Sequence, residues 1–203
     1  MLLLCVSFFS QSMSKVITFS RYFPKSFPLS SNAGKETYFV EQIINSTVSD
    51  WKKLTKEDIN KDVVDLINPF IINDRRMIKK HTIRAGKRWK QGEMFSPRIW
   101  SGKPYASKQI QFLPEMKLER VYDIEIFVKE WFSKPTAFIK VGNNDEVDLS
   151  INLGRAYLET IAKNDGLTYN QFIGWFGLLP MNILNGKFKG FSGQILCWNY
   201  VSY

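Results

Sequence analysis

The hydrophobic and polar positions of this chain follow two periods, and the change between them falls near the middle. In the first third, apolar residues recur at helical spacing, and residues 37–44 predict a helix with one apolar side: Phe39, Val40, Ile43 and Ile44. From residue 94 onward, a period of two dominates in several runs, which indicates half-buried strands. Short strands accompanied by helices predict an α+β protein built around a small curved sheet or barrel.

The longest predicted strand covers residues 117–128. Apolar side chains occupy one face of it, at Leu118, Tyr122, Ile124, Ile126 and Val128, and charged side chains occupy the other. Shorter runs predict further strands at 16–19, 94–100, 108–113, 136–141 and 191–200.

Three further helical patterns flank these strands. Residues 49–68 have helical spacing with a helix start at Thr55, and Pro69 is expected to end that helix. Residues 152–164 predict a second helix. Thr168 to Gln171 form a capping-box sequence that starts a third, whose buried positions are Phe172, Trp175, Phe176 and Leu179.

The chain predicts a single domain over residues 13–203, with a helical insertion at about 46–78. The apolar start lacks the basic region and the cleavage site of a signal peptide, and Met13 resembles a translation start, so residues 1–12 are interpreted as an N-terminal extension. A cleaved signal peptide is the alternative. No segment is long and apolar enough to predict a membrane span, so no membrane partner is expected.

Composition excludes several kinds of site. Two cysteines and one histidine are too few for a disulfide scaffold or a zinc site, so neither a metal nor another cofactor is predicted. The low cysteine content fits a reducing cytoplasm, which is the expected location.

The positive charge of the chain is concentrated in one segment. The net charge is +9, and residues 74–108 alone hold 11 basic and 2 acidic side chains, which is also +9. A local patch of this kind indicates an anion-binding site, with nucleic acid or a nucleotide as the first candidate. The alternative is a solvated basic face.

Candidate binding residues lie at the centre of this segment. If residues 79–84 form a strand, Lys80, Thr82 and Arg84 share one face and form a polar wall. His81 would point away from it. A loop bounded by Gly86 and Gly92 follows and carries the cations Lys87, Arg88 and Lys90. An exposed edge strand with ordinary solvated cations is the competing interpretation.

Aromatic side chains lie among these cations. Trp89, Trp100 and Tyr105 alternate with basic residues that include Lys103, and unpaired bases stack on such rings. Core packing explains the same tryptophans equally well, above all Trp100 on a predicted strand. Asp165 lies between two predicted helices, where an aspartate is by default a turn residue.

Three ordered pieces of the sequence resemble the ASCH domain of the PUA-like superfamily. They are the element from Lys79 to Arg84, the turn from Trp89 to Glu93, and the late segments 162–167 and 193–196. The resemblance implies a small PUA-like β-barrel with flanking helices and a cleft that binds RNA, single-stranded nucleic acid or a modified nucleotide.

One bacterial branch of that family hydrolyses the acetamide of N4-acetylcytidine, which leaves an alternative function open. The resemblance places its catalytic lysine, threonine and acid at Lys79, Thr82 and Asp165, and a motif arginine at Arg84. Two departures count against catalysis: the acid is Asp instead of Glu, and the Lys79–Lys80 doublet makes the register ambiguous. A third interpretation is an accessory protein whose basic patch meets a protein partner. The oligomeric state is not predicted.

Overall fold

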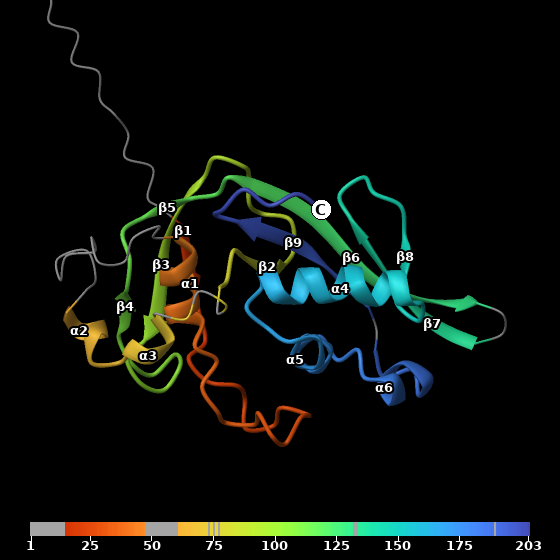
Figure 1. Cartoon of the computed structure of the whole chain (residues 1–203), viewed down its shortest axis with the longest axis horizontal. Helices are drawn as coiled ribbons and strands as arrows, with labels where there is room; N and C mark the ends of the chain where they lie inside the picture. The colour runs from red at the N-terminus through yellow and green to blue at the C-terminus, as the bar shows by residue number, and fades with distance from the viewer. Residues whose placement is uncertain are drawn as a thin grey trace, which may run out of the picture.

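The computed structural model describes residues 15–47, 61–72, 74, 76, 78–131, 134–188 and 190–203. The predicted N-terminal extension, residues 1–12, lies outside these ranges, as does much of the predicted insertion. In the described part of the chain, nine strands form two sheets, and short helices surround them (Figure 1). This confirms the mixed α+β class.

The smaller sheet is built around β3 (Met94–Trp100). β3 pairs in parallel with β1 (Lys15–Thr18) and antiparallel with β4 (Gln109–Gln111) and β5 (Met116–Lys117). The strands predicted at 16–19, 94–100 and 108–113 are therefore confirmed to within two residues at each end. A helix, α1 (Phe39–Thr47), packs beside this sheet (Figure 1).

The larger sheet has the order β2–β9–β6–β7–β8. Its strands are β2 (His81–Ala85), β9 (Phe191–Cys197), β6 (Arg120–Trp131), β7 (Lys134–Val141) and β8 (Val147–Asp148). All neighbours pair antiparallel. β2 is an edge strand, so one of its sides is open to residues from other elements.

Three helices lie over one face of the larger sheet (Figure 1): α4 (Asn152–Asn164), α5 (Tyr169–Trp175) and α6 (Pro180–Leu184). The predicted boundaries of α4 are confirmed, and so is the capping box, in which Gln171 N–H donates to Thr168 Oγ1 and Thr168 N–H donates to Gln171 Oε1. α5 ends at Trp175. Phe172 is buried as predicted, but Trp175 is 37% exposed, and Leu178 is buried where Leu179 was expected.

Two short helices represent the described part of the predicted insertion. They are α2 (Lys61–Val64) and α3 (Pro69–Ile72). Pro69 was expected to end a helix, but α2 already ends at Val64, and Pro69 instead begins α3. Proline suits the first helical turn because its missing N–H is not needed there. No helix in the described ranges has the length and apolar character that crossing a membrane requires.

Candidate functional site

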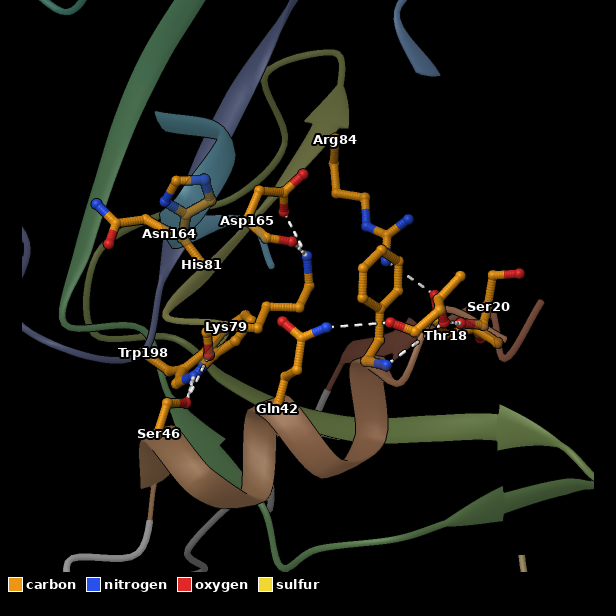
Figure 2. A network of polar contacts seen from close by, with 12 residues as sticks. Thr18, Ser20, Gln42, Ser46, Lys79, His81, Arg84, Asn164, Asp165 and Trp198 are labelled. Atoms are coloured by element: carbon orange, nitrogen blue, oxygen red, sulfur yellow. Dashed lines mark hydrogen bonds and ion pairs between the residues drawn. The ribbon is translucent and has the colours of Figure 1, made fainter. Parts of the chain in front are cut away.

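A buried ion pair joins two segments that lie far apart in the sequence. The Lys79 ammonium donates to a side-chain oxygen of Asp165 and also to its main-chain carbonyl (Figure 2). Lys79 is 1% exposed and Asp165 is 5% exposed. Buried charges occur where they are paired and hydrogen-bonded, so each residue depends on the other. The structure thus brings together two of the three residues that the resemblance selects for chemistry.

The end of α4 sets the position of Asp165. Asp165 N–H donates to Ile161 O at 3.0 Å, and the chain then turns at Gly166, whose φ is +75°. Glycine takes such a left-handed conformation after a helix at little cost. The Lys79 ammonium lies at the negative end of the α4 dipole, which favours a cation there.

The Lys79–Lys80 backbone runs between α1 and α4 and is bonded to both. Lys79 N–H donates to Gln42 O at 3.1 Å, and Lys80 N–H donates to Asn164 O at 2.7 Å. Ser46 Oγ also donates to Lys79 O at 2.5 Å. Because β2 begins only at His81, the predicted alternation does not extend to Lys80. Lys79 and not Lys80 pairs with Asp165.

Burial acts on both members of the pair. It lowers the pKa of Lys79 to about 8, against the favourable effect of Asp165, and the Arg84 charge lowers it further. It raises the pKa of Asp165, although Lys79 and Arg84 oppose that change. Each group is thus shifted toward its neutral form, as expected for charges removed from water.

Arg84 and Thr82 share one face of β2, as the strand pattern predicted. Arg84 donates to Thr18 O at 2.8 Å, and its guanidinium lies 5.6 Å from the centre of the Phe19 ring. Figure 2 shows Arg84 and Lys79 side by side near Asp165. Thr82 is buried. Within the described residues, its hydroxyl makes no hydrogen bond to Lys79 or Asp165, so the predicted trio is only partly assembled.

His81 lies on the opposite face of β2, as predicted. It is fully buried, and its Nδ1 is hydrogen-bonded to the Tyr203 hydroxyl. Burial and the nearby Lys79 charge hold the pKa of His81 well below its usual value. A neutral, enclosed imidazole next to the C-terminal residue is consistent with a structural role.

A cavity of about 620 Å³ adjoins the ion pair. It lies between the segment that leads into α1 and the junction of α4 with α5. Its walls are contributed mainly by polar and aromatic side chains, among them Lys35, Thr37, Tyr38, Gln42, Lys163, Thr168, Tyr169 and Gln171. Ligand pockets typically enclose about 300–1,000 Å³, so this cavity has the size of a nucleotide site.

Gln42 and Gly166 separate this cavity from Lys79 and Asp165. Both residues line the cavity. A Cβ atom at Gly166 would lie 2.4 Å from Gln42 Oε1 and 3.1 Å from Lys79 Cβ. Gln42 Nε2 donates to Thr37 O at 3.0 Å, which fixes the amide (Figure 2). We call Gln42 and Gly166 the inner wall.

The cations of the loop bounded by Gly86 and Gly92 do not line this cavity, and one of them is held in an ion pair. Lys87 forms an ion pair with Asp123 at 2.9 Å and lies 3.9 Å from Glu125. Arg88 and Lys90 are exposed. Trp89 is 5% exposed, and its backbone N–H and C=O are both hydrogen-bonded to the Gln194 amide. A base could not stack on Trp89 without rearrangement of this core residue.

Trp100 and Lys103 are separated from that loop by the length of β3. Seven residues of strand span roughly 20 Å, so these side chains are not part of the same cleft. Trp100 is half-buried against Tyr105, with ring centres 5.3 Å apart, and Lys103 is exposed. The basic segment therefore contributes to three separate places and does not form one continuous cleft.

The residues around the cavity were not selected from the sequence. Gln42 is buried within the apolar pattern of α1, and a polar residue in that position was the available signal. Phe39 does not line the cavity, but it contacts the ion pair, because the Lys79 ammonium lies 4.2 Å from the centre of its ring. The capping box at Thr168 was recognised, but its place on a cavity wall depends on tertiary structure.

Comparison with known proteins gives no relative for this chain: no protein-family model, no curated protein and no solved structure matches it. The resemblance to the ASCH domain therefore remains an expectation from the sequence.

Proposed function

We propose that this protein binds a nucleotide, free or as an unpaired residue of RNA or single-stranded nucleic acid, in the cavity beside Lys79 and Asp165. The observation that carries the proposal is the buried Lys79–Asp165 pair directly behind the inner wall. Ionisable groups with shifted pKa values next to a pocket are characteristic of functional sites. The ASCH resemblance favours the same class of ligand.

The chemistry of the cavity supports this class of ligand. Lys35 and Lys163 are exposed cations on its walls, suited to a phosphate group. The walls also carry the carboxylates of Glu36 and Glu159, and Glu159 is paired with Arg155. Tyr169 offers a ring on which a base could stack. The Gln42 amide on the inner wall carries an oxygen and a nitrogen that suit the hydrogen-bonding edge of a base. Arg88, Lys90 and Lys103 stay candidates for contacts with a longer strand.

The PUA-like barrel belongs to the same proposal. In such a barrel the two sheets close on each other. Backbone hydrogen bonds of one short segment to both sheets support this closure. Leu118 N–H donates to Glu93 O at 2.9 Å beside the smaller sheet, and Glu119 N–H donates to Cys197 O at 2.8 Å in the larger sheet. The chain between β5 and β6 thus joins one sheet directly to the other.

Replacing cavity cations should weaken binding of a short labelled single-stranded RNA in a fluorescence anisotropy assay. We expect Lys163→Gln to lower the affinity about three- to tenfold and to reduce its salt dependence, since one phosphate contact is lost. Lys87→Gln is the matched control, because its charge is already balanced by Asp123, and it should change the affinity less than twofold. No binding by the wild-type chain at low salt would reject the function.

Hydrolysis of a modified nucleoside is a second candidate, favoured by one observation. Lys79 has a pKa lowered to about 8 and lies beside an acid, which suits a general base better than an ordinary lysine. In that reaction Thr82 Oγ1 attacks the acetamide carbonyl, the cytidine amine leaves with a proton, and water hydrolyses the threonine ester. Thr82 does not line the cavity, so catalysis needs a rearrangement that brings the substrate to Thr82, whereas binding does not.

Release of acetate from N4-acetylcytidine tests the second candidate. If the chain is this hydrolase, Thr82→Ala should lower the rate at least 10³-fold because the nucleophile is lost, while Thr82→Ser should keep measurable turnover. Equal rates for the wild type and Thr82→Ala, or no turnover on long incubation, would exclude this role for Thr82.

A further inference from the structure

A second cavity lies next to β2, at the end of α5. It has a volume of about 420 Å³ and is lined by Ile83, Gly177 and Asn182, together with an aromatic set and one cation: Trp175, Phe176, Phe188, Phe191 and Lys187. Ile83 lies between Thr82 and Arg84 in sequence and points to the other face of the strand. This cavity is thus distinct from the first cavity, which Gln42 and Gly166 line, and the two cavities share no lining residue.

Aromatic rings make up much of this cavity. Phe176 and Phe191 meet edge to face with ring centres 5.1 Å apart, which fixes both rings. Trp175 packs its ring against Phe23 and Phe39, yet 37% of it remains exposed. An exposed indole that is held rigidly offers a flat surface for another ring at little entropic cost.

The polar groups of the cavity are few and complementary to a negative charge. Lys187 is exposed, and within the described residues it has no ion-pair partner. Asn182 Nδ2 donates to Gly177 O at 3.1 Å. The Asn182 main-chain carbonyl accepts from Lys187 N–H and Phe188 N–H at 2.8 and 3.0 Å, so the turn that carries Lys187 and Phe188 is fastened to α6.

We propose that this cavity binds a ligand in which a planar aromatic ring is joined to a negatively charged group, such as a nucleoside monophosphate. The ring stacks against Trp175 and its aromatic neighbours, and the phosphate is bound by Lys187. A cation on the rim of an aromatic pocket favours such a ligand over a neutral apolar one, because the phosphate would meet no acidic side chain among the lining residues.

The proposal deepens the proposed function by adding a second nucleotide position, and it rests on that function only if both nucleotides belong to one strand. The same chemistry could come from a free mononucleotide or from a residue of RNA. Ile83 and Ile78 distinguish the two cavities, because Ile83 lines only this cavity and Ile78 lines only the first cavity.

Isoleucine methyl NMR with adenosine monophosphate, adenosine and a phosphorylated trinucleotide as probes tests the proposal. Adenosine monophosphate should shift the Ile83 methyl signal strongly, by the ring current of a stacked base. Lys187→Glu should weaken that effect at least tenfold for the monophosphate but less than threefold for adenosine. Lys134→Glu, an exposed lysine on β7 outside both cavities, is the control and should leave it unchanged.

The possible outcomes separate this inference from the proposed function. An Ile78 shift with an unperturbed Ile83 signal overturns the second position and leaves the first. A shift of the Ile83 signal alone supports the second position and counts against nucleotide binding in the first cavity. A shift that Lys187→Glu leaves unaltered overturns the phosphate contact. Tighter binding of the trinucleotide than of the monophosphate identifies RNA as the source, and equal binding identifies a free nucleotide.

Discussion

Replacing Asp165 with alanine should lower the free energy of unfolding by about 3–5 kcal/mol, the usual cost of leaving one member of a buried ion pair unpaired. Lys79 would keep its buried position without a carboxylate, and burial would lower its pKa further. Urea unfolding at neutral pH measures the effect. The same variant should lose nucleotide binding, since the inner wall rests on Lys79.

A double variant separates the ion pair from the rest of the fold. Lys79→Met together with Asp165→Ala removes both charges and keeps an apolar chain of similar length, so it should be more stable than Asp165→Ala alone by at least about 1.5 kcal/mol. Glu159→Ala is the matched control on α4: it removes an exposed carboxylate paired with Arg155 and should cost under about 1 kcal/mol. Strictly additive losses in the double variant would contradict the pairing.

The second large effect is expected at Gly166. Gly166→Ala places a side chain in the left-handed region, which costs roughly 1–2 kcal/mol. In addition, the new Cβ lies 2.4 Å from Gln42 Oε1, so the Gln42 amide must move and its bond to Thr37 O is strained. We expect a total loss of about 2–3 kcal/mol in unfolding free energy, with at least a tenfold loss of nucleotide affinity.

Gly186→Ala provides the matched comparison. Gly186 also has a positive φ, +62°, but nothing lies within 4 Å of a Cβ added there. This variant should show the backbone strain alone and keep full affinity at the cavity lined by Gln42 and Gly166. Thermal unfolding and nucleotide titration of both variants check the prediction. If Gly166→Ala binds as tightly as Gly186→Ala, the inner wall does not contact the ligand.

Local patterns were sufficient to predict most elements of the larger sheet and its helices. The alternation along 117–128 indicated one long half-buried strand, and Ile124 and Ile126 are buried in β6 as expected. Its start was wrong, because Lys117 belongs to β5 of the smaller sheet and β6 begins at Arg120. The capping box at Thr168 identified the start of α5, because the hydrogen bonds that define it are local. The α+β class followed from these elements. The arrangement of the strands in two sheets did not, since pairing partners are set by non-local contacts.

The candidate site was predictable only in part. The sequence and its ASCH resemblance selected Lys79, Thr82 and Asp165, and the structure pairs the first with the last across 86 positions. The concentrated charge of residues 74–108 was misleading about shape, because burial of Lys79 and Trp89 and the pairing of Lys87 depend on tertiary packing. Gln42 could not be selected for the same reason, since a glutamine within an apolar pattern does not reveal what it faces.

A crystal structure of the chain soaked with a mixture of nucleosides, nucleoside monophosphates and short RNAs tests the central claim most directly. We predict density for a base in the cavity against Gln42 and Gly166, with its phosphate toward Lys35 or Lys163 and the Lys79–Asp165 pair intact behind it. Density for a nucleotide bound elsewhere on the protein, with this cavity empty, would contradict the account.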